Sequence, residues 1–320
     1  MQIKDYVEFQ TRRGVHPLDR QFACSEPKSA PSILLQNLFK DEASVYIVLD
    51  ASKFVQGREV LEQTNGEYRC LFAGETAEDL EDLSPYLVRV ASDDPLLRLL
   101  TTYDPALSPD WTTKHAQHRE AAIFIRSFAG FEALWAHLRH FLRVRDAKGQ
   151  WYFFRFWEPR FNKALARSGV SYGSLSYRLF SKDKLDALIS YIEDEVVVAT
   201  AQAISDSTPI RITESDFQVL RIMRASYFLE RIKQSFRDDD EIWSEEYLDD
   251  NIEKIYCVAL ERGYRIEAAN YLFMRASYRL AQFGLTIDHY ENLVDPERIQ
   301  SPLIRAKAIW ANVEKDFLHA

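Results

Sequence analysis

The segment from residue 121 to residue 165 constrains the fold of this chain more than any other part. It opens with a short apolar run, Ala121–Ile125, whose length and composition predict a buried strand. A helix is expected next, over 130–143, because apolar residues recur there at the spacing of one helical face, at Phe131, Leu134, Leu138 and Leu142. A strand followed directly by an amphipathic helix is typical of α/β folds.

The second half of this segment predicts a turn, a strand and another helix. Lys148-Gly149 follows charged residues and predicts the turn. The aromatic run 151–157 predicts the strand, because aromatic side chains pack well on a pleated surface. Pro159 ends that strand and favours the first turn of a helix, which we expect over 159–167.

This order of motifs resembles the effector-adaptor chaperones of bacterial type VI secretion systems, the Tap or Tec family. The matching positions are Ser127 after the first strand, Gly149 in the turn, and the run Arg155-Phe156-Trp157-Glu158-Pro159-Arg160. Three earlier strand motifs resemble those of the family as well, at 45–52, 68–74 and 84–90. The resemblance covers residues 44–165.

The resemblance implies a non-enzymatic, cytoplasmic adaptor. Such a protein binds a toxic effector protein, helps load it onto the VgrG spike protein, and is not expected to leave with it. The resemblance implies no catalytic, cofactor-binding or metal-binding residues.

Charge is unevenly distributed and bears on the choice of partner. Residues 1–170 carry 22 Lys and Arg against 23 Asp and Glu, whereas residues 171–320 carry 18 against 26, within a total of −9. An acidic second half disfavours nucleic acid, because phosphate binding needs a basic face. It favours a basic or amphipathic protein partner, although acidity is also an ordinary route to solubility.

No membrane association is expected from this sequence. No apolar run approaches the roughly 18 residues of a membrane span, and the first residues lack the apolar core of a signal peptide. The three cysteines are far apart in the chain, which suits a reducing cytosol.

The pattern of elements predicts two lobes. We expect residues 1–208 to form an α/β lobe, a mixed sheet flanked by helices, with strands near 45–49, 68–72, 86–90, 121–125 and 151–157. Residues 195–200 favour a further strand, although residues 183–197 also fit a single helix.

Residues 209–320 are expected to form an all-helical lobe, a bundle of four amphipathic helices. The first begins at a capping-box-like pair, Thr213 and Asp216, and runs to about Arg237. The last begins at Ser301-Pro302.

The sequence offers little chemistry for catalysis or for metal binding. His137 and His140 are spaced so that they could share a metal ligand site, but no further ligand stands at a suitable spacing. Because both lie off the apolar stripe of the predicted helix, they are expected to be exposed to solvent. His115 and His118 lie in a polar loop. Cys70 lies in a predicted strand, where a thiol behaves as a small apolar group, and Cys24 has no activating helix start beside it.

Five residues are candidates for partner binding. Arg155, Trp157 and Arg160 lie in the best-matched segment; they fit the rim of a protein groove, although pairing with Glu158 or Asp146 is the more ordinary role for the arginines. Trp243 and Tyr247 lie within an acidic run, 238–253, where they are candidate anchors for a basic segment.

The aromatic run itself has two faces. Alternation puts Trp151, Phe153, Arg155 and Trp157 together on one face of the predicted strand. We expect that face to be covered by a helix; the alternative is an exposed aromatic platform for a partner.

Two other functions stay open at this point. One is an acidic, immunity-like protein that binds and neutralises a basic toxin. The other is an enzyme that uses Cys70 or Cys24 as a nucleophile, which an unusually fast thiol reaction near neutral pH would reveal.

Overall fold

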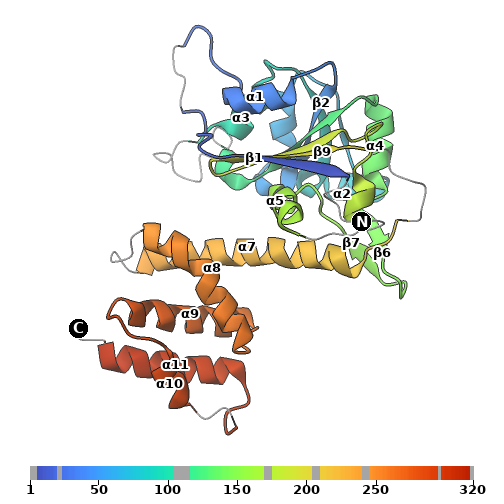
Figure 1. Cartoon of the computed structure of the whole chain (residues 1–320). Coiled ribbons are helices and arrows are strands. Elements are labelled where there is room, and N and C mark those ends of the chain that lie inside the picture. Colours follow the sequence, from blue (N-terminus) through green and yellow to red (C-terminus); the bar gives the residue numbers. More distant parts are fainter. Residues whose placement is uncertain are drawn as a thin grey trace. The chain divides into compact units, whose positions relative to one another are not determined.

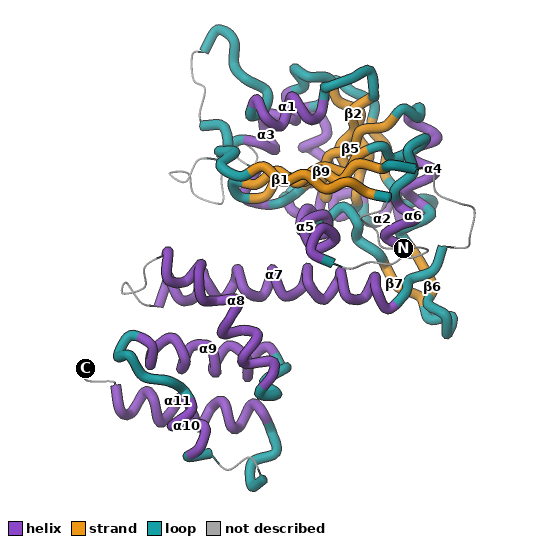
Figure 2. The backbone as a smooth tube through the Cα atoms, viewed as in Figure 1, coloured by secondary structure: helices purple, strands orange, loops and turns teal. Residues whose placement is uncertain are grey.

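A computed structural model describes residues 6–19, 24–103, 116–168, 175–203, 210–239, 245–294 and 297–317. The chain forms two compact units, Met1–Met223 and Arg224–Ala320. Figure 2 shows that the strands belong to the first unit, whereas the described part of the second unit is made of helices and loops. The prediction of an α/β lobe followed by a helical region is therefore confirmed.

The first unit is built on an antiparallel sheet. Within the described residues, seven strands lie in the order β1-β9-β8-β5-β2-β4-β3, and each neighbouring pair is antiparallel. The strands are β1 (Val7–Arg12), β2 (Ser44–Asp50), β3 (Tyr68–Cys70), β4 (Pro85–Val90), β5 (Ala122–Ser127), β8 (Ala187–Ile192) and β9 (Glu195–Ala201). The short strand β3 and the N-terminal strand β1 are the two edges of this sheet.

Each face of the sheet packs against its own hydrophobic core. In β2, Tyr46 and Val48 belong to one core, whereas Val45, Ile47 and Leu49 belong to the other. The central strands are buried on both faces, which is why they read as continuous apolar runs rather than as alternating ones.

Helices and 3-10 turns cover the two faces (Figure 1). Residues of α4 (Phe131–Arg139), α5 (Pro159–Arg167) and α6 (Leu175–Leu179) contribute to the core that contains Tyr46. Residues of α1 (Ser32–Leu38), α3 (Pro95–Thr101) and the 3-10 helix η3 (Gly57–Gln63) contribute to the other. The remaining short elements are α2 (Glu75–Asp79), η2 (Ala51–Lys53), η4 (Glu81–Leu83) and η5 (Gln117–Arg119).

The predicted strand over 151–157 is shorter than expected. Only β7 (Trp151–Phe153) is a strand, and it pairs with β6 (Arg143–Arg145) in a separate two-stranded hairpin of the described residues. After Phe153 the chain leaves the hairpin, because Phe154, Phe156 and Trp157 all enter the same core and abandon the alternation of a strand. The turn at Gly149, with φ +83°, joins the two strands as the sequence predicts.

The helix proposed as an alternative for residues 183–197 is wrong. These residues form the β8–β9 hairpin, with Glu193 in a left-handed conformation at the turn. The buried amide of Asn162 in α5 donates to the carbonyl oxygens of Leu188 and Val197, at 2.9 Å each, and so fastens α5 to this hairpin.

The helical unit forms around α9 (Glu267–Ala281). Phe273, Ala276 and Leu280 of α9 join one hydrophobic cluster with α11 (Pro302–Phe317). Met274 and Tyr278, on another face of α9, pack in a second cluster with residues of α7 (Glu214–Asp239) and α8 (Glu245–Glu261). The short helix α10 (Asp288–Asn292) was not predicted.

The boundary predicted between residues 208 and 209 lies outside the described residues. The two compact units divide farther along the chain, between Met223 and Arg224, inside helix α7. The predicted cap of that helix is present, because the Asp216 carboxylate accepts hydrogen bonds from the backbone N–H and the hydroxyl of Thr213.

Candidate partner-binding pocket

Arg155 is held by two carboxylates of its own chain. Its guanidinium lies 2.5 Å from Asp50 and 2.9 Å from Glu158, and 40% of its side chain is exposed. The pairing with Glu158 that the sequence suggested is confirmed. Asp146, the other suggested partner, instead accepts hydrogen bonds from the turn amides of Lys148 and Gln150.

Arg160 is also paired. Its Nε donates to both carboxylate oxygens of Glu120, at 3.0 and 2.8 Å, and Glu193 lies 3.7 Å away. Only 11% of its side chain is exposed. This arginine joins α5 to the loop before β5 and to the β8–β9 turn.

Trp157 does not lie on the surface. It is 2% exposed and packs edge-on against Phe153 and Phe156, with ring centroids 5.7 and 5.3 Å away. Its indole is therefore a core side chain, although the sequence placed it among the candidate partner contacts.

The side chains of the two candidates from the acidic run, Trp243 and Tyr247, lie outside what the structure describes. Trp243 lies outside the described residues. Tyr247 lies in α8, but its side chain is outside what the structure describes.

The histidines and cysteines do not assemble a reactive centre in the described part of the chain. One ring nitrogen of His137 lies 2.8 Å from the carbonyl oxygen of Leu179, and burial lowers the pKa of this imidazole to about 4. The predicted exposure of His137 is therefore wrong, whereas that of His140 is confirmed. Across the described ranges, no group of three or more His, Cys, Asp or Glu residues is placed to hold a metal ion. His115 lies outside those ranges.

Cys70 is partly buried in β3, and burial raises the pKa of its thiol. That direction opposes the lowered pKa of an activated cysteine nucleophile. Cys24 is exposed.

A pocket of about 570 Å³ opens near the end of β3, within the first unit. Two parts of the chain that are far apart in the sequence form it: the chain after β3, and the region that runs from the end of α4 through the β6–β7 hairpin. The lining residues are Leu71, Phe72, Ala73, Leu80, Arg139, Leu142, Arg143 and Phe153.

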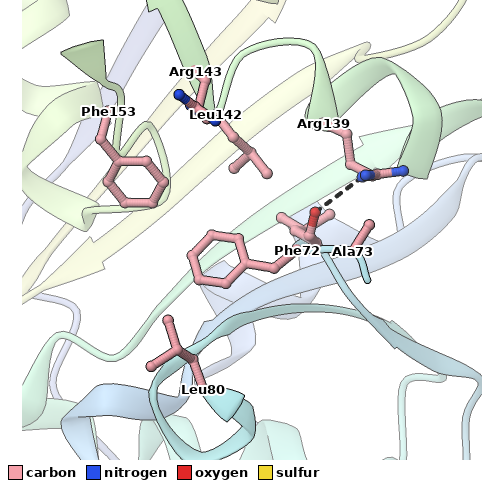
Figure 3. Close-up of a pocket in the computed structure, with 8 residues that line it drawn as sticks. Phe72, Ala73, Leu80, Arg139, Leu142, Arg143 and Phe153 are labelled. Atoms are coloured by element: carbon pink, nitrogen blue, oxygen red, sulfur yellow. Dashed lines mark hydrogen bonds between the residues drawn. The ribbon is translucent and has the colours of Figure 1, made fainter. Parts of the chain in front are cut away.

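The pocket is mainly apolar. Leu71 and Leu142 are buried and form its base, while Leu80 and Phe153 are exposed at its opening. The rings of Phe72 and Phe153 lie 5.7 Å apart, and Figure 3 shows them with Leu80 and Leu142 around one common space.

Arg139 supplies a fixed positive charge to the pocket. Its Nε donates to the carbonyl oxygen of Leu71 at 3.1 Å (Figure 3), and its guanidinium lies 4.4 Å from the Trp135 ring centroid. The indole N–H of Trp135 in turn donates to the carbonyl oxygen of Cys70 at 2.8 Å. These contacts orient the guanidinium without neutralising it.

Arg143 supplies the second charge. Its guanidinium lies 5.0 Å from the ring centroid of Trp151, and that of Arg145 lies 4.0 Å from the same centroid. Throughout the described residues, no carboxylate is within ion-pair distance of Arg139, Arg143 or Arg145.

Trp151 and Phe153 extend this surface beyond the pocket. They are 44% and 49% exposed, so the expectation that a helix covers their face is wrong for these two residues. The alternative platform suggested by the sequence fits them. The sequence held a signal for this platform: Trp151 and Phe153 alternate along one strand of the hairpin, and Arg143 and Arg145 alternate along the other.

Sequence reasoning missed most of the pocket. Leu80, Arg139 and Arg143 have no motif of their own, and they meet Phe153 only through the fold.

Part of the chain matches a protein-family model. Residues 45–170 match the model of a domain of unknown function, DUF4123, which is associated with type VI secretion effector adaptors. The matched range includes every residue that lines the pocket. No curated protein and no solved structure matches the chain. Among the helices in the described ranges, none has both the length and the apolar character needed to cross a membrane.

Proposed function

We propose that this protein is a cytoplasmic adaptor that binds a type VI secretion effector and helps load it onto the VgrG spike. One observation carries the proposal: the matched domain contains an apolar pocket with exposed aromatic side chains and arginines that lack carboxylate partners in the described structure. Aromatic residues and arginine dominate the binding energy of protein interfaces.

The proposed activity is binding, and it assigns no catalytic residue. Because Trp151 and Phe153 are exposed on a short hairpin, covering them with a partner removes apolar area from water without rearranging the sheet. The proposal therefore needs a preformed surface and no chemical step.

An immunity-like role is the second candidate. It rests on the acidic second half of the chain, which suits a basic toxin. The two roles differ in what happens to the toxin. An adaptor leaves its activity intact and promotes its delivery, whereas an immunity protein blocks its activity.

The test compares the proteins secreted by the host strain, by a strain lacking this gene, and by the complemented strain. Quantitative mass spectrometry of the medium measures each secreted protein under conditions in which the secretion system is active. We expect one effector to disappear from the medium of the deletion strain and to return on complementation, while the tube and spike proteins of the system are still secreted.

Three other outcomes contradict the proposal. Unchanged secretion of every effector excludes a loading role. Loss of all secreted components indicates part of the apparatus instead. Self-intoxication of the deletion strain with normal secretion indicates the immunity role.

A further inference from the structure

We propose that the pocket beside β3 is the docking site for an acidic, amphipathic peptide segment of the partner protein. An apolar side chain of that segment enters the pocket, and a neighbouring Asp or Glu pairs with Arg139 and Arg143. This inference rests on the proposed function, since it names the chemistry by which the effector is recognised.

The apolar part of the site is preformed. Leu71 and Leu142 are buried at its base, so their positions are fixed by the core. Phe72 and Phe153 face each other at 5.7 Å across the hairpin and the end of β3. The volume of about 570 Å³ lies within the range of roughly 300–1,000 Å³ typical of ligand sites. It therefore accommodates more than one apolar side chain.

The charged part of the site selects a carboxylate. Arg139 and Arg143 line the pocket, and no carboxylate in the described part of the chain pairs with either. Arginine presents a planar fork of donors that matches a carboxylate. The contacts of Arg139 with Leu71 and Trp135, and of Arg143 with Trp151, restrict both side chains before a partner arrives. Such preorganisation lowers the entropic cost of binding.

The wall of the pocket that faces the two arginines determines how the bound segment is oriented. Leu80 follows the acidic helix α2, whose carboxylates do not line the pocket. The carboxylate of the bound segment therefore points toward α4 and β6, away from α2. A basic segment finds no carboxylate among the lining residues, and the net charge of −9 disfavours nucleic acid.

The test uses a random-peptide library displayed on phage, selected against the full chain. Recovered peptides are synthesised, and their affinities are measured by calorimetry with the full chain and with four variants. Phe153→Ser and Arg143→Gln alter the pocket. Phe128→Ser replaces an aromatic residue that is 57% exposed elsewhere on the same unit. Arg12→Gln replaces an exposed arginine of β1, at the opposite edge of the sheet from β3.

We expect the recovered peptides to share an apolar residue next to Asp or Glu. Their affinity should fall roughly thirtyfold with Phe153→Ser and about tenfold with Arg143→Gln, and it should stay unchanged with both controls. Exchanging the peptide carboxylate for its amide should weaken binding to the wild type but add little in Arg143→Gln, because the two changes remove one interaction.

Failure to recover any peptide, recovery of basic peptides, or equal affinities for all variants would overturn the inference. Self-association of the chain that Phe153→Ser abolishes would also overturn it, because the occupant would then be a second copy. The secretion experiment uses the gene deletion alone, so its result decides the adaptor role independently of the pocket.

Discussion

Two groups of arginines in the first unit have opposite environments. The paired arginines, Arg126, Arg155 and Arg160, each contact at least one carboxylate of the same chain. Within the described residues, the pocket arginines, Arg139 and Arg143, contact aromatic rings and a carbonyl oxygen but no carboxylate. The difference teaches that Arg155 and Arg160, which belong to the recognisable 155–160 run, fasten the fold together with Arg126, whereas the two arginines that line the pocket carry no motif of their own.

The aromatic run shows the same division within seven residues. Trp151 and Phe153 stay exposed on the hairpin, whereas Phe154, Phe156 and Trp157 enter the core. The core and the proposed partner surface therefore use adjacent side chains, which separate variants can distinguish.

The largest expected effect is on stability, from Trp157→Ala. Removing this buried indole leaves a cavity, so we expect the free energy of unfolding to fall by about 4 kcal/mol. Trp151→Ala is the matched control and should cost less than about 1 kcal/mol, because its ring is half exposed. Urea denaturation followed by circular dichroism measures both. Equal losses would mean that the division of the aromatic run is incorrect.

The next largest effect is expected from Arg126→Leu. Arg126 is buried and lies 2.5 Å from Asp41 and 2.7 Å from Asp186, so its removal leaves the buried Asp186 without its counter-ion. We expect a loss of about 3 kcal/mol in urea denaturation. The double variant Arg126→Leu/Asp186→Leu should recover part of that loss, since it removes the unpaired charge. A double variant less stable than Arg126→Leu would contradict this role.

A third effect tests the helix that presents Arg139 to the pocket. His137 lies on the same helix with its pKa lowered from 6.5 to about 4, mainly by burial. The unfolded chain therefore binds the proton more tightly, and the stability that neutral His137 contributes is complete above pH 6.5. It is lost as pH falls toward 4, by up to about 3 kcal/mol.

His137→Gln should flatten the dependence of unfolding free energy on pH between 6.5 and 4. His140→Gln, at the exposed residue that follows this helix, should change the dependence less, because burial is the largest cause of the lowered pKa of His137 and the charge of His140 is a smaller one. An unaltered pH profile in His137→Gln would show that other groups control the acid response.

The smallest stability effects compare one arginine from each group. Arg160→Gln removes a largely buried pair with Glu120 and should cost about 1 kcal/mol. Arg143→Gln removes no ion pair that the described structure contains and should change stability by less than about 0.5 kcal/mol. Thermal unfolding of both variants shows which of them loses more stability. A larger loss of stability for Arg143→Gln than for Arg160→Gln would contradict the division into paired and pocket arginines.

Much of the fold could be predicted from the sequence, because its signals are local. Apolar runs predicted β2 and β5, and the Thr213–Asp216 cap predicted the start of α7. Local signals failed where tertiary packing decided the outcome. Residues 195–200 favoured a strand, but residues 183–197 also fitted a helix, because both faces of the β8–β9 hairpin are buried and this erases the alternation of a strand.

The site was harder to predict, because it depends on contacts between distant residues. Arg155 finds Asp50 more than one hundred positions away along the chain, and Arg160 finds Glu120 forty positions away. The local pattern predicted the pairing of Arg155 with Glu158, but it does not reveal the pairs with Asp50 and Glu120. The pocket likewise needs the end of β3 beside the end of α4, which only the assembled unit provides.

The most direct test measures secretion of the adaptor-dependent effector from strains that carry chromosomal variants of this gene. The pocket variant is Arg143→Gln/Phe153→Ser, and the control variant is Arg12→Gln/Phe128→Ser, with equal protein levels verified by immunoblot. The account predicts that the effector disappears from the medium in the pocket variant and is secreted normally in the control. Normal secretion in the pocket variant, with the effector still lost on deletion of the gene, would contradict the claim that the pocket arginines and Phe153 recognise the partner.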